Sequence, residues 1–427
     1  MNMYTEKART IPIAAEVDVL VAGGGPAGFA AAYTAAKNGA DTLLLEQSGD
    51  VGGMSTIGLM SHWTGSCGGK LYSEILQRSA ARNPAGTEHF SPKLINTEEL
   101  KTLYLEMLEE AGARLMLYTF VSDVIVEDGT VKGVIAENKA GRQAIMAKTV
   151  IDATGDGDVA ARAGAEFQLG REDDRKMQPM TLMFKVGGVD LENAALPGSF
   201  ETLVETEKGE LQALAKQLLP HPAGHVLLYE NVLPGVVTVN MTNVTGADGT
   251  NPEDLTKATI ESRKQIGKIV AFLREYVPGF ENCFLVTSAS FMGVRETRHF
   301  EGVSKLTEQD ILEARQFPDW VVRDAHFNFD VHNISGSGLD KTGAQKHFTQ
   351  QKGYDIPIGC LIPKEIDGLI LSGRNISGTH MAHSNFRVMP ICVGTGAAAG
   401  AIGALAAKGG VRPRDVEAAA VQAVLLG

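Results

Sequence analysis

The stretch that decides the fold is VDVLVAGGGPAGFAAAYTAAKNGADTLLLE, residues 17–46. Its first part, Val17 to Ala22, is an apolar run typical of a buried parallel strand. An alanine-rich run from Ala27 to Asn38 predicts a helix that Gly39 ends, and Thr42 to Glu46 predicts the next strand. A strand, a helix and a strand in this order form a right-handed unit with a parallel pair. The stretch therefore predicts a doubly wound, Rossmann-like α/β sheet.

The glycines inside this stretch match G-x-G-x-x-G between a strand and a helix. Gly23 permits the tight turn, Gly25 lets a pyrophosphate approach the backbone, and Gly28 lets helix and strand pack closely. The phosphates would bind the free N–H groups at the start of the helix. Glu46 ends the second strand, where its carboxylate can accept hydrogen bonds from a ribose. The pattern predicts a dinucleotide-binding site.

Three later segments indicate which dinucleotide is bound. They are DVGGMS (50–55), DATGDGD (152–158) and SGRN (372–375), and each is a flexible turn just after a predicted strand. An NAD-binding unit does not need them. Four elements spread over the whole chain suit a longer cofactor that lies extended across the sheet, as FAD does.

The rest of the chain divides into a hairpin and a second domain. Strand-like runs on both sides of Asp128-Gly129 predict a side sheet, and residues 148–154 predict an apolar strand that returns to the main sheet. Separated strand-like runs after about residue 167 predict a mostly antiparallel α+β domain, and LILS (369–372) predicts a strand back in the first sheet. We expect an FAD-binding domain over residues 1–166 and 353–427, with a substrate domain inserted over residues 167–352.

One long helical run is expected in the second domain, from Thr256 to Tyr276. Its apolar residues recur at near-helical spacing and should form its buried face; they are Ile260, Ile266, Ile269, Val270 and Leu273.

Composition excludes several classes of partner. The chain has 427 residues and a net charge of −12 without a run of Lys or Arg, so neither nucleic acid nor an anionic membrane surface is an expected partner. The four cysteines show no C-x-x-C spacing and the N-terminus lacks an apolar core, which predicts a reduced, cytoplasmic protein. Residues 388–407 are uncharged and long enough to cross a bilayer, but they are mostly Ala and Gly, so we expect a buried helix.

Six motifs carry a resemblance over nearly the whole chain. They are VDVLVAGGGPAG, VGGMST, VIDATGDGDVAARAGA, GVRETRHFEG, YDIPIGCLIP and LILSGRNISGTHMAHSNFRVMP, in this order. Together they resemble the bacterial FAD-dependent oxidoreductases allied to the fumarate reductase and succinate dehydrogenase flavoproteins. The resemblance implies non-covalent FAD and a mostly β substrate domain above the flavin, but it does not identify a substrate.

The resemblance also implies a set of FAD contacts in this chain. They are Gly23, Gly25, Pro26, Ala27, Gly28, Glu46, Gln47, Gly53, Met54, Ser55, Val121, Gly155, Asp156, Gly373, Arg374, Arg387, Val388, Met389 and Pro390. A helix that begins at Pro390 would direct free N–H groups at the pyrimidine end of the flavin. Positive charge there, with Arg387 adding to it, favours the anionic reduced flavin.

Proton transfer requires a residue that titrates near neutral pH, which favours histidine. His380 is the first candidate, because it lies between two segments that should both reach the flavin. His332, next to Asp330, and Arg298 are the further predicted catalytic residues, and His62 is another possibility. His380 and His383 have the spacing of a metal pair, but no suitable third ligand is close in the sequence, so no metal is predicted.

These observations predict an oxidoreductase that exchanges a hydride between flavin N5 and a small organic substrate. The direction stays open between dehydrogenation of an alcohol or amine carbon and reduction of an activated alkene. A flavin monooxygenase and a non-catalytic flavin-binding protein are the alternatives. Without a second glycine motif for NADH or NADPH, electrons would pass through the substrate pocket or a separate electron-transfer protein.

Overall fold

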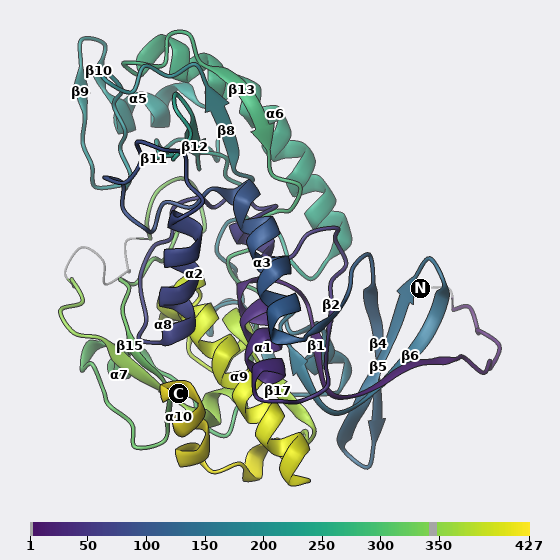
Figure 1. Ribbon diagram of the computed structural model, residues 1–427. Helices are drawn as coiled ribbons and strands as arrows, with labels where there is room; N and C mark the ends of the chain where they lie inside the picture. Colours follow the sequence, from purple (N-terminus) through teal and green to yellow (C-terminus); the bar gives the residue numbers. More distant parts are fainter. Residues whose placement is uncertain (1–2, 341–347) are drawn as a thin grey trace.

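The computed structural model describes residues 3–340 and 348–427, and it has two bodies, one above the other in Figure 1. The lower body is built on a sheet with the strand order β3-β2-β1-β6-β5-β4, and β17 also pairs with β6. Its strands are β1 (Ile13–Ala22), β2 (Thr42–Leu45), β3 (Arg114–Met116), β4 (Phe120–Glu127), β5 (Thr130–Asn138), β6 (Gly141–Asp152) and β17 (Leu369–Leu371). The pairs that involve β1, β2, β3 and β17 are parallel; the sequence predicted the parallel pair of β1 and β2, but no strand at β3.

The predicted side sheet and the predicted return strand share one strand, β6. The first half of β6 pairs antiparallel with β5, and its second half pairs parallel with β1 and β17. The turn between β4 and β5 has positive φ at both Asp128 (47°) and Gly129 (72°), which is the conformation that the Asp-Gly pair predicted. Two expected layers are therefore one continuous sheet.

Helices α1 (Pro26–Lys37) and α9 (Met389–Gly409) pack closely beside this sheet. A Cβ at Gly396 would lie 2.2 Å from the carbonyl oxygen of Ala27, and one at Gly400 would lie 2.3 Å from that of Ala31. The G-x-x-x-G pair is therefore the surface on which α1 packs. Within the described residues α9 is the one helix long and apolar enough to cross a membrane, and 83% of that stretch is buried inside the protein.

The upper body holds a four-stranded antiparallel sheet with the order β11-β12-β8-β13. Its strands are β8 (Phe184–Gly187), β11 (Leu228–Glu230), β12 (Val237–Val239) and β13 (Phe284–Ser288), accompanied by α5 (Leu211–Leu218) and the long α6 (Pro252–Tyr276). The prediction of a buried Ile260 is wrong, because its side chain is 51% exposed, whereas the other four predicted positions of α6 are buried or nearly so. Ile260 lies two residues from the buried Ala258 and Ser262, which places it on the opposite face of α6.

Buried apolar side chains form two clusters. The second runs from Leu182 to Ala289 and includes Leu59, whereas Phe300, Leu306 and the residues up to Phe329 pack with the first. The remaining elements are α2 (Lys70–Ala80), α3 (Thr97–Ala111), α4 (Asp158–Arg162), β7 (Phe167–Leu169), β9 (Glu205–Thr206), β10 (Gly209–Glu210), β14 (Arg298–Phe300), α7 (Glu308–Leu312), β15 (Trp320–Ala325), β16 (Tyr354–Pro357), α8 (His380–Phe386) and α10 (Ala418–Leu426). The predicted domain boundaries at 166 and 352 stay a prediction.

Candidate cofactor and active site

Of the three motif glycines in the turn before α1, one leaves space for a ligand. A Cβ at Gly23, where φ is +95°, would lie 2.6 Å from a backbone oxygen, and one at Gly28 would lie 1.8 Å from another. A Cβ at Gly25 would meet no described atom within 4 Å. Gly25 is also the N-cap of α1 and its helix end has no side-chain cap. The open space at Gly25 therefore fits a phosphate bound at the helix N-terminus.

The four predicted cofactor segments meet at this end of α1. The N–H of Gly52 donates to Gly24 at 2.7 Å, and a Cβ at Gly53 would lie 3.1 Å from the Cα of Gly25. A Cβ at Gly373 would lie 3.0 Å from that of Ala27. These close approaches bring the second and the fourth segment against the first.

An ion pair joins the third segment to the fourth. Arg374 lies 2.7 Å from the carboxylate of Asp156, and its guanidinium stands beside Gly155. Arg298 donates to the carbonyl oxygen of Asp156 at 2.7 Å and to Asp158 at 2.9 Å. Arg298, a predicted catalytic residue, therefore holds the turn at Asp156.

Glu46 is buried at the end of β2, where the cofactor's ribose was expected. Its carboxylate accepts hydrogen bonds from the N–H of Gly24 and of Ser48, both at 2.7 Å. The N–H of Thr119 donates to the backbone oxygen of Glu46, which brings the start of β4 and Val121 close to this end of the sheet. Gln47 is exposed, and the hydroxyl of the buried Ser55 donates to Gly52 inside its own turn.

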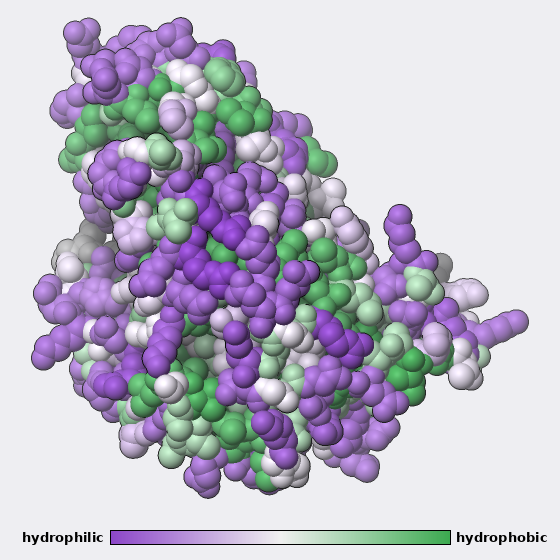
Figure 2. Space-filling view, in the orientation of Figure 1, coloured by the Kyte–Doolittle hydropathy of each residue, from purple (hydrophilic) through white to green (hydrophobic). Residues whose placement is uncertain are grey.

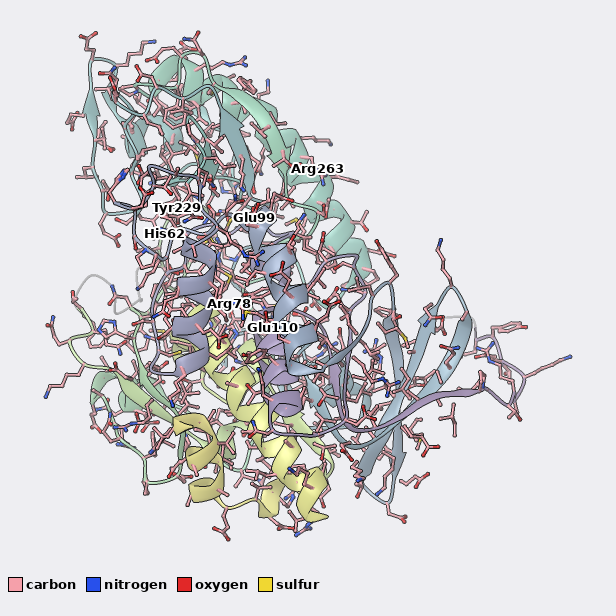
Figure 3. All side chains as sticks on the ribbon, in the orientation of Figure 1. His62, Arg78, Glu99, Glu110, Tyr229 and Arg263 are labelled. Atoms are coloured by element: carbon pink, nitrogen blue, oxygen red, sulfur yellow. The ribbon has the colours of Figure 1, made fainter. Side chains whose placement is uncertain are left out.

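A cavity of about 560 Å³ lies where the two bodies meet. Five of the predicted FAD contacts line it: Met54, Arg374, Arg387, Val388 and Met389. The upper body and the chain after it contribute Phe200, Tyr229, Asn240, Arg295, Asp330 and His332. In Figure 3 the side chains of His62 and Tyr229 lie together at this junction, and their rings stack with centroids 5.3 Å apart. The cavity joins the predicted cofactor site to polar groups of the upper body.

Asp330 organises the charged groups in the cavity. Its Oδ2 lies 2.9 Å from Nη2 of Arg387 and 3.2 Å from Nε2 of His332. Burial raises the pKa of Asp330, but the interaction with His332, which includes a hydrogen bond, and the charges of Arg387 and Arg295 outweigh it, so the net pKa is lowered and the carboxylate is ionised. An ionised carboxylate accepts the Nε2 proton of His332, which leaves the lone pair of the ring on Nδ1.

His332 and Arg295 are buried, and both have a lowered pKa. Burial, followed by the charge of Arg295, lowers the pKa of His332 to about 4. Burial, followed by the charge of Arg387, lowers the pKa of Arg295 to about 10. At neutral pH His332 is therefore an uncharged base and Arg295 still a cation. The Nε of Arg387 is buried without a hydrogen-bond partner in the described structure, which makes it an unsatisfied donor of a residue that lines the cavity.

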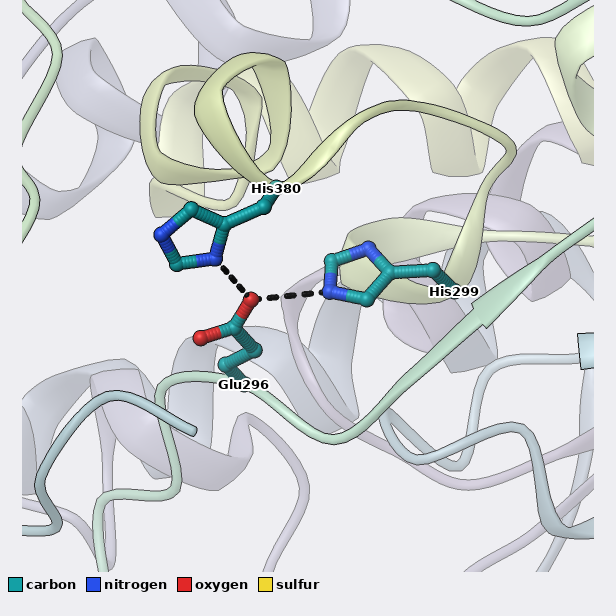
Figure 4. Close-up of side chains that lie close together, drawn as sticks. All are labelled: Glu296, His299 and His380. Atoms are coloured by element: carbon teal, nitrogen blue, oxygen red, sulfur yellow. Dashed lines mark hydrogen bonds and ion pairs between the residues drawn. The ribbon is translucent and has the colours of Figure 1, made fainter. Parts of the chain in front are cut away.

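His380 is not among the described residues that line this cavity. It is the first residue of α8 and its Nδ1 lies 2.5 Å from Oε1 of Glu296, to which Nε2 of His299 also bonds at 2.8 Å (Figure 4). Glu296 is fully buried. The other oxygen of Glu296 accepts the N–H of Gln178 at 2.9 Å, and the side-chain oxygen of Gln178 accepts the N–H of His332 at 3.2 Å. His380 thus lies behind the cavity wall.

These three side chains also form a group that could hold a metal ion, with ligand atoms within 4.8 Å of one another. Both ring nitrogens converge on the same carboxylate oxygen at hydrogen-bond distance, however. The carboxylate also has a third donor in Gln178. This geometry satisfies Glu296 as a hydrogen-bond acceptor. That the site holds no metal ion stays a prediction.

Burial and charge have opposite effects within this group. Burial lowers the pKa of His380, but the hydrogen bond and the charge of Glu296 outweigh it, so the net pKa is raised above 6.5. Burial raises the pKa of Glu296, but the bonds from His299 and His380 outweigh it and the net pKa is lowered. Glu296 is therefore an ionised carboxylate held by two imidazoles.

The N-terminus of α9 lies at the cavity, and the helix begins at Met389, one residue before the predicted start at Pro390. Its N-cap, Val388, gives no side-chain hydrogen bond, so the N–H groups of the first turn have no side-chain cap. Val388 and Met389 line the cavity. This supports the predicted helix N-terminus beside the cofactor.

Sequence reasoning missed Glu296, Gln178, Tyr229 and Phe200. Glu296 stands inside a motif that was used only for its neighbours, and a glutamate in a polar segment carries no signal of burial. Tyr229 lies in β11 and Phe200 in a connecting segment, where both read as ordinary apolar residues. Their place at the cavity depends on how the upper body sits on the lower one.

A Rossmann-like sheet whose glycine turn is met by three further segments is the arrangement of a flavin dinucleotide-binding protein. The profile of a family described as FAD dependent oxidoreductase matches residues 18–425. The chain belongs to the FAD-dependent oxidoreductase family, and is an enzyme with FAD as its cofactor.

Two archaeal proteins are similar to part of this chain. Digeranylgeranylglycerophospholipid reductase 1 of Methanococcoides burtonii is 28% identical over 204 residues, which are 42% of this chain and 47% of that protein. Thiamine thiazole synthase of Aeropyrum pernix is 33% identical over 181 residues, 38% of this chain and 63% of that protein. The matches thus cover about half of the first relative and less than two thirds of the second.

A triple mutant of the flavin-dependent brominase Bmp2 has a similar fold, with a TM-score of 0.50 and 14% identity over 92% of this chain and 81% of that one. This similarity confirms the predicted fold, and the family match confirms FAD as the cofactor. The finer resemblance to bacterial fumarate reductase flavoproteins stays a prediction, and the two curated relatives named here are archaeal.

Proposed function

We propose that this enzyme exchanges a hydride between FAD and a small organic substrate that carries a carboxylate. The observation that carries the proposal is the charge of the cavity between the two bodies. Arg295 and Arg387 each contribute a guanidinium group to the wall of the cavity. The buried carboxylate beside them, that of Asp330, is already bonded to Arg387 and His332. A buried cation needs a partner, and a substrate carboxylate would supply it.

When bound, FAD supplies a hydride acceptor and donor at N5. Arg295 would hold the substrate carboxylate, and Arg387 would share in it through its free Nε. His332 would take the proton from a substrate OH or NH with the lone pair on Nδ1, while Asp330 stabilises the imidazolium that forms. Because His332 is uncharged at neutral pH, we favour dehydrogenation of an alcohol or amine carbon over reduction of an activated alkene.

His380 was the first candidate for this proton transfer. We now assign the role to His332, because His332 lines the cavity and His380 bonds to Glu296 behind it. Arg298 is a positioning residue that acts through Asp156. We expect variants of His380 and Arg298 to change the rate of flavin reduction by substrate, because both residues hold the geometry of the site.

The proposal is tested by an anaerobic screen on the FAD-loaded protein. Small 2-hydroxy and 2-amino acids are added to the oxidised flavin, and α,β-unsaturated acids to flavin reduced beforehand with dithionite; each acid is compared with the matching amide, and the absorbance of the flavin is followed. We expect an acid to change the redox state of the flavin at least tenfold faster than its amide. Equal rates for acids and amides would remove the carboxylate from the proposal.

The flavin monooxygenase is the alternative, and its reductant separates the two functions. We expect NADH and NADPH to reduce the flavin slowly, since no second glycine motif opens a helix elsewhere in the sequence. Rapid, saturable reduction by NADPH followed by oxygen-dependent hydroxylation of a substrate would favour the monooxygenase. We also propose that the enzyme acts on a small-molecule substrate and uses a separate electron-transfer partner. We propose a cytoplasmic location as well, since its four cysteines are free and buried, as in a reducing compartment.

A further inference from the structure

A second cavity, of about 630 Å³, lies apart from the reaction cavity described above. It lies among α1, α2, β15, α9 and α10, and the two cavities share no lining residue. A short ladder separates them: Ser66 exchanges two backbone hydrogen bonds with His326, and Gly68 donates to Arg323. The volume is in the range of small-molecule sites.

The wall of this cavity is apolar and aromatic. Tyr33 of α1, Tyr72 of α2 and Trp320 of β15 contribute rings, and Val322, Val393 and Leu425 contribute alkyl side chains. In Figure 2 apolar residues gather over α10 and the neighbouring part of α9, below the hydrophilic surface of α2 and α3. The body of a ligand here would be aromatic or aliphatic.

Positive charge surrounds this apolar wall. Lys37, Lys70 and Arg323 line the cavity, and within the described residues none of them forms an ion pair with an Asp or Glu side chain, although Lys70 donates to the backbone oxygen of Gly427 at 3.3 Å. Lys37 stands over the ring of Tyr33, and Arg323 over that of Trp320. Of the two acids that line it, Glu74 already pairs with Arg78. Asp324 is the other acid at the wall, so three cations face two acids, one of them already paired, and this local excess of positive charge favours an anion in a chain with a net charge of −12.

A buried polar atom also lacks a partner here. The hydroxyl of Tyr72 makes no hydrogen bond within residues 3–340 and 348–427, although the residue is only 6% exposed. A buried hydroxyl without a partner is costly, and because its oxygen exposes almost no surface, a ligand atom in the cavity reaches it only if the ring of Tyr72 turns. This observation is independent of the charges at the rim.

We propose that this cavity is a second binding site, for a small amphipathic anion with an aromatic or aliphatic body and one carboxylate or sulfonate group. The apolar body fills the space between Tyr72, Trp320 and Val393, and the anionic group meets Lys37, Lys70 or Arg323. The site shares no residue with the reaction cavity, so it does not depend on the proposed reaction. It touches the same helix, α9, one to two turns after the residues that line the reaction cavity.

Calorimetric titration of the FAD-loaded protein with 2-naphthoate, and with the neutral 2-naphthamide, tests the proposal. Ala397→Phe places a ring inside this cavity, and Ser199→Trp places one at the rim of the reaction cavity as the matched control. We expect naphthoate to bind wild type and Ser199→Trp alike, and Ala397→Phe at least tenfold more weakly. Naphthamide should bind wild type at least threefold more weakly than naphthoate.

A second variant avoids the buried position. The combined change Lys37→Gln, Lys70→Gln and Arg323→Gln should weaken naphthoate binding about tenfold and leave naphthamide binding unchanged, whereas Lys268→Gln on α6 should alter neither. No measurable binding of naphthoate up to about 1 mM would overturn the proposal. So would unchanged binding to both Ala397→Phe and the triple variant, or loss of binding in Ser199→Trp alone.

Discussion

The Oε1 atom of Glu296 lies 2.5 Å from Nδ1 of His380, although the two residues are 84 positions apart in the chain. The bond joins the segment before β14 to the first residue of α8, and both side chains are buried. Glu296 reaches the cavity wall through Gln178 and the backbone of His332. His380 therefore influences the proposed reaction through the position of other groups.

The first prediction concerns this bond. Glu296→Gln removes the charge that holds His380 and His299, so the pKa of His380 should fall below 6.5 and the free energy of unfolding should drop by about 3 kcal/mol. Carbon-13 NMR of labelled histidine and urea unfolding measure the two effects. Glu172→Gln is the matched control: exposed Glu172 accepts the backbone N–H of His380 and affects the ring through its charge alone, so the variant should lower the pKa of His380 less than Glu296→Gln does and cost less than about 1 kcal/mol. An unchanged pKa and midpoint in Glu296→Gln would contradict this assignment.

The second prediction concerns the cofactor. Purified protein should be yellow, and acid should release its flavin into the supernatant as FAD. Gly25→Val should abolish FAD binding yet keep the fold, because its side chain enters open space that the pyrophosphate needs. Gly267→Val on α6, where a Cβ also meets no described atom, should bind FAD normally. Flavin that stays with the acid pellet, or normal loading of Gly25→Val, would refute the prediction.

The third prediction separates the two histidine candidates. His332→Ala should slow flavin reduction by substrate about 10²–10⁴-fold, as loss of a general base does. The wild-type rate should fall as the pH drops toward about 4, where His332 becomes protonated, and this acid limb should vanish in the variant. Rapid-mixing measurements without oxygen record both. If His380→Ala shows the larger loss and His332→Ala reacts normally, proton transfer belongs to His380.

The fourth prediction concerns substrate binding. Arg295→Gln should raise KM for the carboxylate substrate about 10–100-fold, since a hydrogen-bonded charge pair is worth about 1.5–3 kcal/mol. The effect should shrink for the amide of the same substrate. Arg263→Gln, which changes an exposed arginine of α6 (Figure 3), should leave KM unchanged. Equal KM values for Arg295→Gln and wild type would move the substrate carboxylate elsewhere.

The fifth prediction is a loss of stability in acid. Burial lowers the pKa of His225 to about 3 and that of His332 to about 4, both below the ordinary 6.5. Below pH 6.5 the unfolded chain binds protons that the folded chain does not, so stability falls as the pH drops from 6.5 toward 4. Each histidine contributes at most about 3 kcal/mol to this loss. Urea midpoints across this range should fall less steeply in His225→Gln than in wild type, while His89→Gln, at an exposed histidine, should follow wild type.

Local patterns predicted the fold of the FAD-binding part. The apolar run before Gly23, the alanine-rich helix and the strand that ends at Glu46 all form where they were expected. These elements depend on short-range periodicity and on the backbone freedom of glycine, which can be read from neighbouring residues. The four glycine-containing turns meet at one helix end because the carboxyl ends of parallel strands lie at the same edge of the sheet.

Tertiary structure alone decided which side chains share the cavity. Chain position favoured His380 because it stands between two cofactor segments, yet α8 turns it toward Glu296, and His332 reaches the cavity from the chain that follows the upper body. Glu296 is buried against His380, and Asp330 pairs with Arg387. Both contacts join residues that are far apart in the sequence. Such contacts depend on how two separately patterned bodies pack against each other, and no local periodicity encodes that packing.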